Sequence, residues 1–383
     1  MRVQPGGILA GPFNGSGAKF LIHGVRKPMM LNPSPYATST SNEEDFGGLN
    51  ISMLNLIFQK QITTISSIPP QYRLHFSRTL KTSLDKVLVN PCDLKSWLQL
   101  LLLPIFTLNL YFPKTSREER SGNRKRLQTT AINKALNTWR EPNGCSILIQ
   151  KLLEAQIEAQ RSREQRTRKK PKTNVEACRK KLRFGKYTSS IIILSSNGVA
   201  LHNEDTLHEL QQKHPYAPPP IIPPDNIECS PVSVDSKAVF AAIKGFPKGT
   251  SCGRDGLRAQ HLLDALSGSA AAVSEELLTS IAGVVNLWLS GRCPTALGEY
   301  IVSAPLTPLL KPDGGLRPIA VGTVWRRLCS KLAASFVCKE MESYLGNHQF
   351  GVGISCGGES ILHAARGWCW IWSTSATNNN FAY

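Results

Sequence analysis

The feature that most constrains this fold is a proline-rich segment, HPYAPPPIIPPD, between His214 and Asp225. Proline has no amide hydrogen and a fixed φ, so neither a helix nor a central strand can run through such a segment. Closely spaced prolines favour an extended, polyproline-like spacer. We therefore place the main domain boundary here. A ligand for an SH3 domain is the alternative interpretation of the same residues.

The charge of the chain indicates a polyanionic partner. Lys and Arg number 45 against 27 for Asp and Glu, a formal net charge of +18 in 383 residues. Such an excess is typical of proteins that bind nucleic acid or an acidic membrane surface. The most apolar stretch, residues 92–112, contains Gln99, Pro104 and Asn109, which are unusual in a membrane span of about 20 apolar residues. We therefore expect RNA or DNA as the partner, no membrane, and a buried core helix in this stretch.

Much of the positive charge lies just before the proline-rich segment. Residues 161–186 contain twelve Lys or Arg and two acids. Within them, the sequence RTRKKPK is dense enough for a nuclear-import signal or a phosphate-binding arm, while a solvated linker is the alternative. Its candidate residues are Arg166, Arg168, Lys169, Lys170 and Lys172. This patch predicts a nuclear protein.

The beginning of the chain favours a second location as well. The first 42 residues contain no Asp or Glu, as in some organelle-targeting leaders. They are also rich in Gly and Pro, which disfavours an amphipathic targeting helix. We predict a disordered leader over residues 1–50, with an organelle as the alternative to the nucleus.

Hydrophobic periodicity predicts helices on both sides of the proline-rich segment. Residues 51–160 are expected to be helical, including Leu127–Trp139 and Ile147–Ile157. After residues 161–232, the basic segment and linker, the pattern is that of a compact α+β domain. Its expected elements are a helix capped by Ser233 with the apolar face Val239, Ala242, Ile243 and Phe246, a helix near Leu257, and helices at Ser274–Leu289 and Val324–Tyr344.

A β-hairpin is expected in VSAPLTPLLKPDGGLRPIAVG. Two short apolar runs flank Asp313-Gly314, a strong signal for a tight turn. Pro305 and Pro308 predict that the first strand lies at a sheet edge. One cation stands on each side of the turn, Lys311 and Arg317, and together they could hold phosphate oxygens. On charge alone, two solvated side chains remain the alternative.

The amino-acid sequences of four segments resemble motifs of a known protein family. LTPLLKPDGGLRPIAVG resembles the fingers hairpin of reverse transcriptases, and FPKGTSCGRDGLRAQHLLDAL resembles the "G-x-D-G-L" segment before it. VGTVWRRLCSKLAA resembles the helix after that hairpin, and QFGVGISCGGESILHAAR resembles the "Q-F-G-F" entry to the palm. The chain therefore resembles RNA-directed DNA polymerases of the non-LTR retrotransposon type, in their amino-terminal extension plus fingers region.

This resemblance implies a fold and a set of roles. The fold would be α+β, a mostly helical amino-terminal region followed by a partial reverse-transcriptase fingers subdomain with a β-hairpin over residues 233–367. Lys311 and Arg317 would contact the triphosphate of the incoming nucleotide. The template path would include Asp255, Gly256, Arg326 and Arg327, the last two being equally compatible with solvated charges. Palm entry would be at Gln349, Phe350 and Gly351.

By the same resemblance, the carboxylates that bind the catalytic metal ions are missing from this sequence. Nucleotidyl transfer uses two metal ions held by carboxylates, and the family's enzymes would use Mg²⁺. The last Asp is Asp313 and the last Glu is Glu359, and residues 368–383 read as an aberrant tail. We therefore expect truncation before the palm, no catalytic residue, no bound metal and no polymerase activity from this chain alone. A non-catalytic nucleic-acid-binding protein and a mobile-element remnant are the alternatives, with self-association through an exposed fingers–palm face.

Overall fold

The computed structural model describes residues 49–60, 62–111, 118, 121–164, 174–182, 187–201, 203–215, 232–311, 313–346, 349–351, 354 and 356–366. The chain divides into two compact units, Met1–Leu328 and Cys329–Tyr383, and the division falls inside α14 (Val324–Leu345). The described residues are mostly helical and hold one two-stranded antiparallel sheet, as the predicted α+β class requires. The predicted tail at 368–383, and the leader except for its last two residues, lie outside the described residues.

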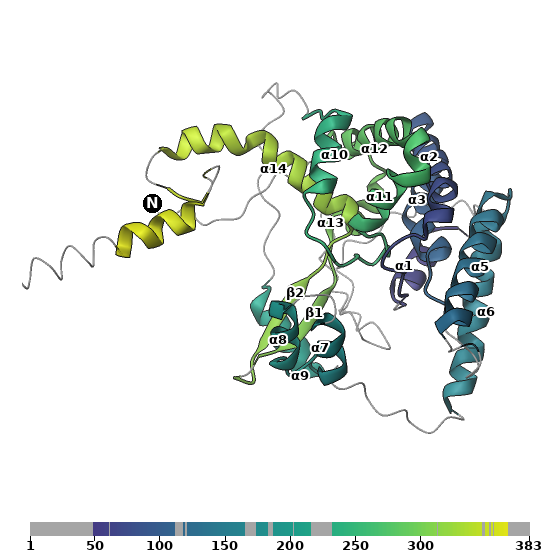
Figure 1. The fold of residues 1–383 in the computed structure, drawn as a ribbon, viewed down its shortest axis with the longest axis horizontal. Coiled ribbons are helices and arrows are strands. Elements are labelled where there is room, and N and C mark those ends of the chain that lie inside the picture. Colours follow the sequence, from purple (N-terminus) through teal and green to yellow (C-terminus); the bar gives the residue numbers. More distant parts are fainter. Residues whose placement is uncertain are drawn as a thin grey trace, which may run out of the picture. The chain divides into compact units, whose positions relative to one another are not determined.

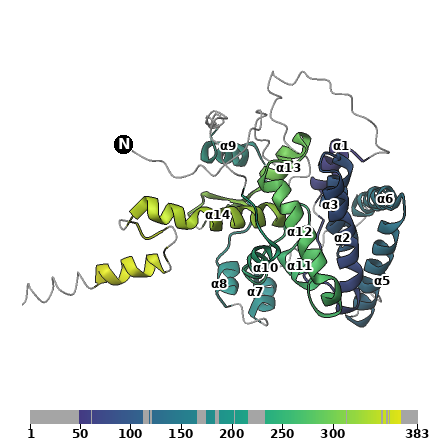
Figure 2. The same cartoon turned by 90° about the horizontal axis from the view of Figure 1, so that it is seen from above.

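Helices from both ends of the first unit form its core. Figures 1 and 2 show α2 (Arg73–Val89) beside α12 (Ser274–Leu289), with α3 (Leu94–Thr107) next to α2. The helices α5 (Ser121–Arg140) and α6 (Gly144–Glu164) lie side by side along the flank of this core. The two helices predicted within residues 127–157 are therefore confirmed. In α12 the apolar stripe faces inward, burying Leu277, Ile281, Val284 and Val285.

The most apolar stretch of the sequence is a core helix. Asp93 caps α3 by accepting hydrogen bonds from the backbone N–H groups of Lys95 (3.2 Å) and Ser96 (3.1 Å). Trp97 is fully buried, and its ring meets that of Trp288 edge-on with centroids 6.1 Å apart. The buried-core interpretation of this stretch is thus confirmed. By length and composition alone, Gly268–Leu289 could also cross a membrane, but 44% of its apolar window is buried within the protein.

An inter-segment seam, residues 64–77 against residues 256–267, joins the chain before the proline-rich segment to the chain after it. The hydrogen bonds are Thr64 Oγ1 to Gly256 O (2.6 Å), Ile68 N to Asp264 Oδ2 (2.7 Å), Ser77 Oγ to Ala265 O (2.6 Å) and His261 Nε2 to Ile65 O (2.7 Å). The first unit therefore combines helices from before and after the proline-rich segment, and the domain boundary predicted there stays a prediction. The helices combine because the apolar faces of α2 and α12 bury each other.

The predicted hairpin is present as β1 (Leu306–Leu310) and β2 (Leu316–Ala320), paired antiparallel from Leu306↔Ala320 to Leu310↔Leu316. On the outer side of β1, Val199 forms a single antiparallel bridge with Leu309. There Ala200 N donates to Pro308 O (2.9 Å) and Leu310 N donates to Gly198 O (3.0 Å). The first strand therefore has β2 on one side and a short bridging segment on the other.

The remaining helices of the first unit frame the hairpin and the core. One prediction is corrected: α10 begins after Asp235, whose Oδ1 accepts from Ala238 N (2.7 Å), and not after Ser233. Val239, Ala242 and Ile243 are buried on α10 as expected, whereas Phe246 lies beyond its end. The bounds are α1 (Ile51–Phe58), η1 (Pro70–Tyr72), α7 (Asn174–Leu182), α8 (Tyr187–Leu194), α9 (Glu204–Lys213), α10 (Ser236–Lys244), α11 (Ala259–Ala265), η2 (Gly268–Val273), η3 (Thr295–Leu297) and α13 (Gly298–Val302).

The second unit contains the rest of α14 and a helix at residues 357–366. The predicted helix Val324–Tyr344 is confirmed by α14. Large apolar side chains on this unit are exposed: Phe336, Met341, Tyr344, Leu345, Phe350, Ile361 and Leu362.

Candidate nucleic-acid interface

The turn of the hairpin is closed by backbone hydrogen bonds. Lys311 N donates to Gly315 O (2.8 Å), and Gly314 N donates to Lys311 O (3.1 Å). Gly314 has φ +85°, which a residue without a Cβ adopts at no steric cost. Asp313 accepts from Gly315 N through Oδ1 (3.1 Å), a local bond that favours turns. The Asp-Gly signal therefore produces the predicted hairpin for the expected physical reasons.

The strand register brings the two predicted nucleotide-binding cations together. Arg317 pairs directly with Leu309, so these two side chains share a face. Lys311 is two residues further along the same chain and projects from that face as well, because side chains alternate along a strand. Arg317 is exposed and Lys311 is half-buried. The opposite face packs Leu316 and Leu310 against Ala200 and Leu210.

A carboxylate that the sequence analysis missed lies beside this hairpin. Glu209 Oε1 on α9 accepts from Leu316 N (2.9 Å) and from Lys213 Nζ (2.5 Å). The hydrogen bond from Lys213, then that from Leu316, hold the pKa of Glu209 below its ordinary value, and the charge of Lys311 adds to this. Part of the Lys311 charge is therefore offset locally. The spacing of Glu209 and Lys213 on one helix was the available signal.

The predicted template-path residues Asp255 and Gly256 are buried in this structure, and their place beside a template stays a prediction. Asp255 has no exposed surface, and burial raises the pKa of its carboxyl group to about 7. Its Oδ1 accepts from Leu257 N at 3.3 Å. Gly256 has φ +70°, and a Cβ there would lie 2.6 Å from Cγ2 of Thr64. Gly256 belongs to the inter-segment seam, because its carbonyl oxygen accepts from Thr64 Oγ1, and Asp255 directly precedes it.

A neighbouring arginine, which the sequence analysis did not single out, positions the chain before the hairpin. Arg254 is buried, with its guanidinium 5.4 Å from the ring centre of Phe58 and 5.1 Å from that of Tyr300. Its Nη2 donates to Glu299 O (3.1 Å), Tyr300 O (3.3 Å) and Ser303 Oγ. Because these acceptors belong to α13 and its C-cap, Arg254 fixes the segment that leads into β1. Nothing in the sequence distinguishes this arginine from a solvated one.

The two arginines predicted beside the template differ in the structure. Arg327 donates from Nη2 to Ser251 O (2.6 Å) and lies 5.9 Å from the ring centre of Phe246. Burial lowers its pKa. Arg327 is thus half-buried with its guanidinium bonded to a backbone carbonyl, and its predicted template contact stays a prediction. Arg326 is half-exposed near the start of α14, and its predicted template contact stays a prediction as well.

The other predicted sites lie in different parts of the chain. Gln349, Phe350 and Gly351 belong to the second unit, where Gly351 N donates to Gln349 Oε1 (2.8 Å) and Phe350 is 44% exposed. The basic patch Arg166, Arg168, Lys169, Lys170 and Lys172 lies outside the described residues. Among the described residues, no group of three or more His, Cys, Asp or Glu is placed to hold a metal ion. Asp313 bonds within the turn and Asp255 is fully buried, so no magnesium site is assigned among the described residues.

Comparison with known proteins identifies a retrotransposon relative. The chain is similar to the retrotransposable element SLACS 132 kDa protein of Trypanosoma brucei gambiense, with 34% identity over 123 residues. That alignment covers 32% of this chain and 10% of the relative, so it spans about a tenth of the relative's length. No family model and no solved structure matches the chain. The chain is therefore related, over about a third of its length, to a protein of a mobile element.

Proposed function

We propose that this chain carries the fingers hairpin and amino-terminal helical region of a reverse transcriptase of the non-LTR retrotransposon type. One observation carries the proposal: the strand register projects Lys311 and Arg317 from one face beside a tight turn. The similarity to a retrotransposon protein supports the same lineage. RNA or DNA would be the macromolecular partner.

The hairpin would hold the phosphates of an incoming nucleotide. Arg317 offers a planar fork of donors that matches phosphate oxygens, and Lys311 offers a compact positive charge. The packing of Leu316 and Leu310 against Ala200 and Leu210 holds the strands that present them. Glu209 partly offsets Lys311, so Arg317 should contribute more to phosphate binding.

Triphosphate binding tests the role of these two cations. Binding of a fluorescent deoxynucleoside triphosphate to the intact chain should weaken about tenfold, or ~1.4 kcal/mol, in Arg317→Gln, and less in Lys311→Gln. The matched controls are Arg292→Gln and Lys237→Gln, which remove exposed charges elsewhere in the first unit. Equal affinities in all four variants would contradict the proposed nucleotide contact.

A second candidate function is nucleic-acid binding without catalysis. It is favoured by two acids of the first unit: Asp313 bonds within the turn and Asp255 is fully buried, so neither is placed to hold a metal ion. We expect the purified chain to bind RNA or DNA with little sequence preference and a steep salt dependence, but not to extend a primer with Mg²⁺. Primer extension by the chain alone would refute the absence of catalysis, and an affinity that does not change with salt would refute binding through the phosphate backbone.

A further inference from the structure

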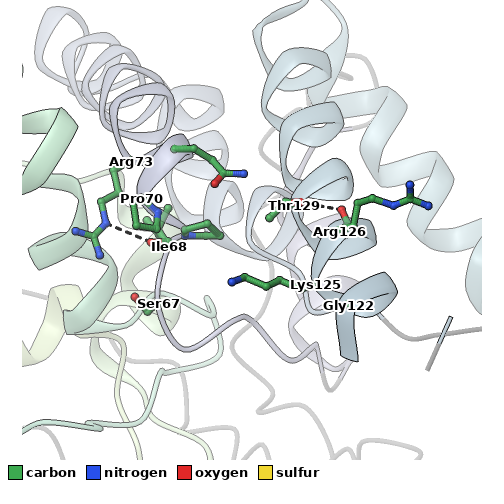
Figure 3. Close-up of a pocket in the computed structure, with 10 residues that line it drawn as sticks. Ser67, Ile68, Pro70, Arg73, Gly122, Lys125, Arg126 and Thr129 are labelled. Carbon is green, nitrogen blue, oxygen red and sulfur yellow. Dashed lines mark hydrogen bonds between the residues drawn. The ribbon is translucent and has the colours of Figure 1, made fainter. Parts of the chain in front are cut away.

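An open pocket of about 630 Å³ lies between the turn that precedes α2 and the first turns of α5 (Figure 3). One wall is the segment Ser67–Gln71 together with Arg73, and the other is formed by residues of α5. The α5 residues are Gly122, Lys125, Arg126 and Thr129. Neither wall includes an acidic residue.

The first wall holds an arginine in a fixed position. Arg73 donates from Nε to Ile68 O (3.2 Å) and from Nη1 to Ser267 Oγ (3.2 Å). Its Nη2 pairs with Asp264 Oδ1 at 3.0 Å, and the side chain remains 21% exposed. A cation held by three contacts loses little conformational freedom when it meets a ligand. Asp264 offsets much of the charge of Arg73. An anionic ligand would therefore need a further cation on the other wall of the pocket.

The second wall supplies one such cation, Lys125. Figure 3 shows Lys125 pointing from α5 across the pocket toward the turn at Ile68 and Pro70, whereas the guanidinium of Arg126 points away. Lys125 forms no ion pair with any residue that the structure describes, and α5 contains no Asp or Glu. The preceding carboxylate that the structure describes, Glu118, accepts from the hydroxyl of Tyr111 (3.1 Å). The charge of Lys125 is therefore available to a ligand.

The remaining surface of α5 indicates which polyanion fits. An acidic membrane is bound by helices that place large apolar side chains beside their cations. The exposed residues of α5 are instead glycine, polar or charged: Gly122, Arg124, Lys125, Arg126, Thr130, Lys134, Asn137 and Arg140. A charged surface without apolar anchors suits the phosphodiester backbone of a nucleic acid.

We propose that this pocket binds a backbone phosphate of the RNA or DNA strand, with Lys125 and Arg73 as its contacts. The inference rests on the proposed function, since it names where nucleic acid meets the amino-terminal helices. It adds a phosphate site remote in sequence from the hairpin cations and from the basic segment 161–186. The site fixes the register of the strand on the protein and reads no sequence.

A charge-matched pair of variants tests the site in the intact chain. Lys125→Gln and Lys134→Gln each remove one exposed lysine from α5, and the two positions are two and a half turns apart, on opposite sides of the helix. Binding of a labelled single-stranded RNA of mixed sequence is followed by fluorescence anisotropy over a salt series. Lys125→Gln should lower the slope of log Kobs against log salt by about 0.7 and weaken binding at low salt up to about fivefold. Lys134→Gln should leave both unchanged, and Lys125→Arg should restore both.

Three results would overturn the site. One is an equal slope for Lys125→Gln and Lys134→Gln; the second is an absence of RNA binding by the parent chain. The third is loss of binding to phosphatidylserine vesicles in Lys125→Gln with unchanged RNA binding, which would assign the pocket to a membrane. The first result would leave the proposed function standing. Triphosphate binding by the hairpin depends on Arg317, and it can be measured separately on the same Lys125→Gln protein. In the opposite case, Arg317→Gln would not weaken triphosphate binding while Lys125→Gln still lowered the salt slope of RNA binding. That outcome would reject the nucleotide contact of the hairpin and retain the phosphate site in the pocket.

Discussion

Asp264 is the residue whose replacement most directly tests the inter-segment seam. Its carboxylate is buried and accepts from Ser67 Oγ (2.7 Å) and Ile68 N (2.7 Å) through Oδ2. Through Oδ1 it accepts from Gln260 Nε2 (3.1 Å) and pairs with Arg73 (3.0 Å). Asp264→Asn keeps the shape but turns one acceptor into a donor and removes the charge opposite Arg73.

The expected loss of stability follows from these contacts. Breaking a buried ion pair by removing one partner costs about 3–5 kcal/mol. Arg73 remains 21% exposed, so water recovers part of that energy, and we expect a loss of about 3 kcal/mol. The turn before α2 should loosen at the same time, because Ile68 N loses its carboxylate acceptor.

Urea unfolding followed by circular dichroism measures this loss. The control is Asp205→Asn, an exposed carboxylate in the first turn of α9, whose removal should cost less than about 1 kcal/mol. A loss for Asp264→Asn no larger than that of the control would refute the reasoning. It would mean that the segments on either side of the proline-rich linker do not depend on each other.

Three further predictions concern buried residues. Gly256→Ala should lower the free energy of unfolding by about 2–4 kcal/mol, since the added Cβ clashes with Thr64 and the backbone is left-handed. Gly291→Ala, with φ +69° and open space around it, should lower it by about 1–2 kcal/mol, and urea midpoints compare the two variants. Burial lowers the pKa of His261 to about 4, so its contribution to stability is present above about pH 6.5 and is lost, by about 3 kcal/mol, as the pH falls toward 4. The difference in unfolding free energy between the parent and His261→Gln should therefore shrink over that range, and a constant difference would contradict the assignment. Trp97→Ala should cost about 3–5 kcal/mol by urea unfolding because the ring is fully buried, and a loss below 1 kcal/mol would show that α3 is not a core helix.

Local signals in the sequence predicted the local structure well. The apolar stripe that begins at Leu277 predicted α12 with the bounds that it has, because one side of a helix must be buried. The Asp313-Gly314 turn predicted the hairpin, which the strand pairing confirms. The start of α10 was misassigned because Ser233 and Asp235 are both good N-caps, and only the structure shows which side chain accepts from the helix.

Long-range features could not be predicted from one sequence. Asp255 was assigned to the template path because its segment resembles a family motif, but its burial and the charge of Arg327, 72 positions later, define its environment. Asp264 reads as an ordinary surface acid in the sequence, and its burial depends on a turn nearly two hundred positions earlier. From residue 216 on, the proline-rich segment lies outside the described residues, so the predicted interruption of helix and strand there stays a prediction.

The backbone groups at the edges of the hairpin limit how a ligand can bind to it. Pro308 and Pro318 stand opposite each other and have no N–H to offer, while the outward N–H groups of Leu310 and Leu316 already donate to Gly198 and Glu209. Lys213 occupies the outward carbonyl of Leu316 (2.7 Å). Over these residues the ribbon cannot template an extra strand from a neighbouring polypeptide, which guards it against edge-to-edge aggregation. A ligand that binds this part of the hairpin must therefore be bound by its side chains and not by its backbone.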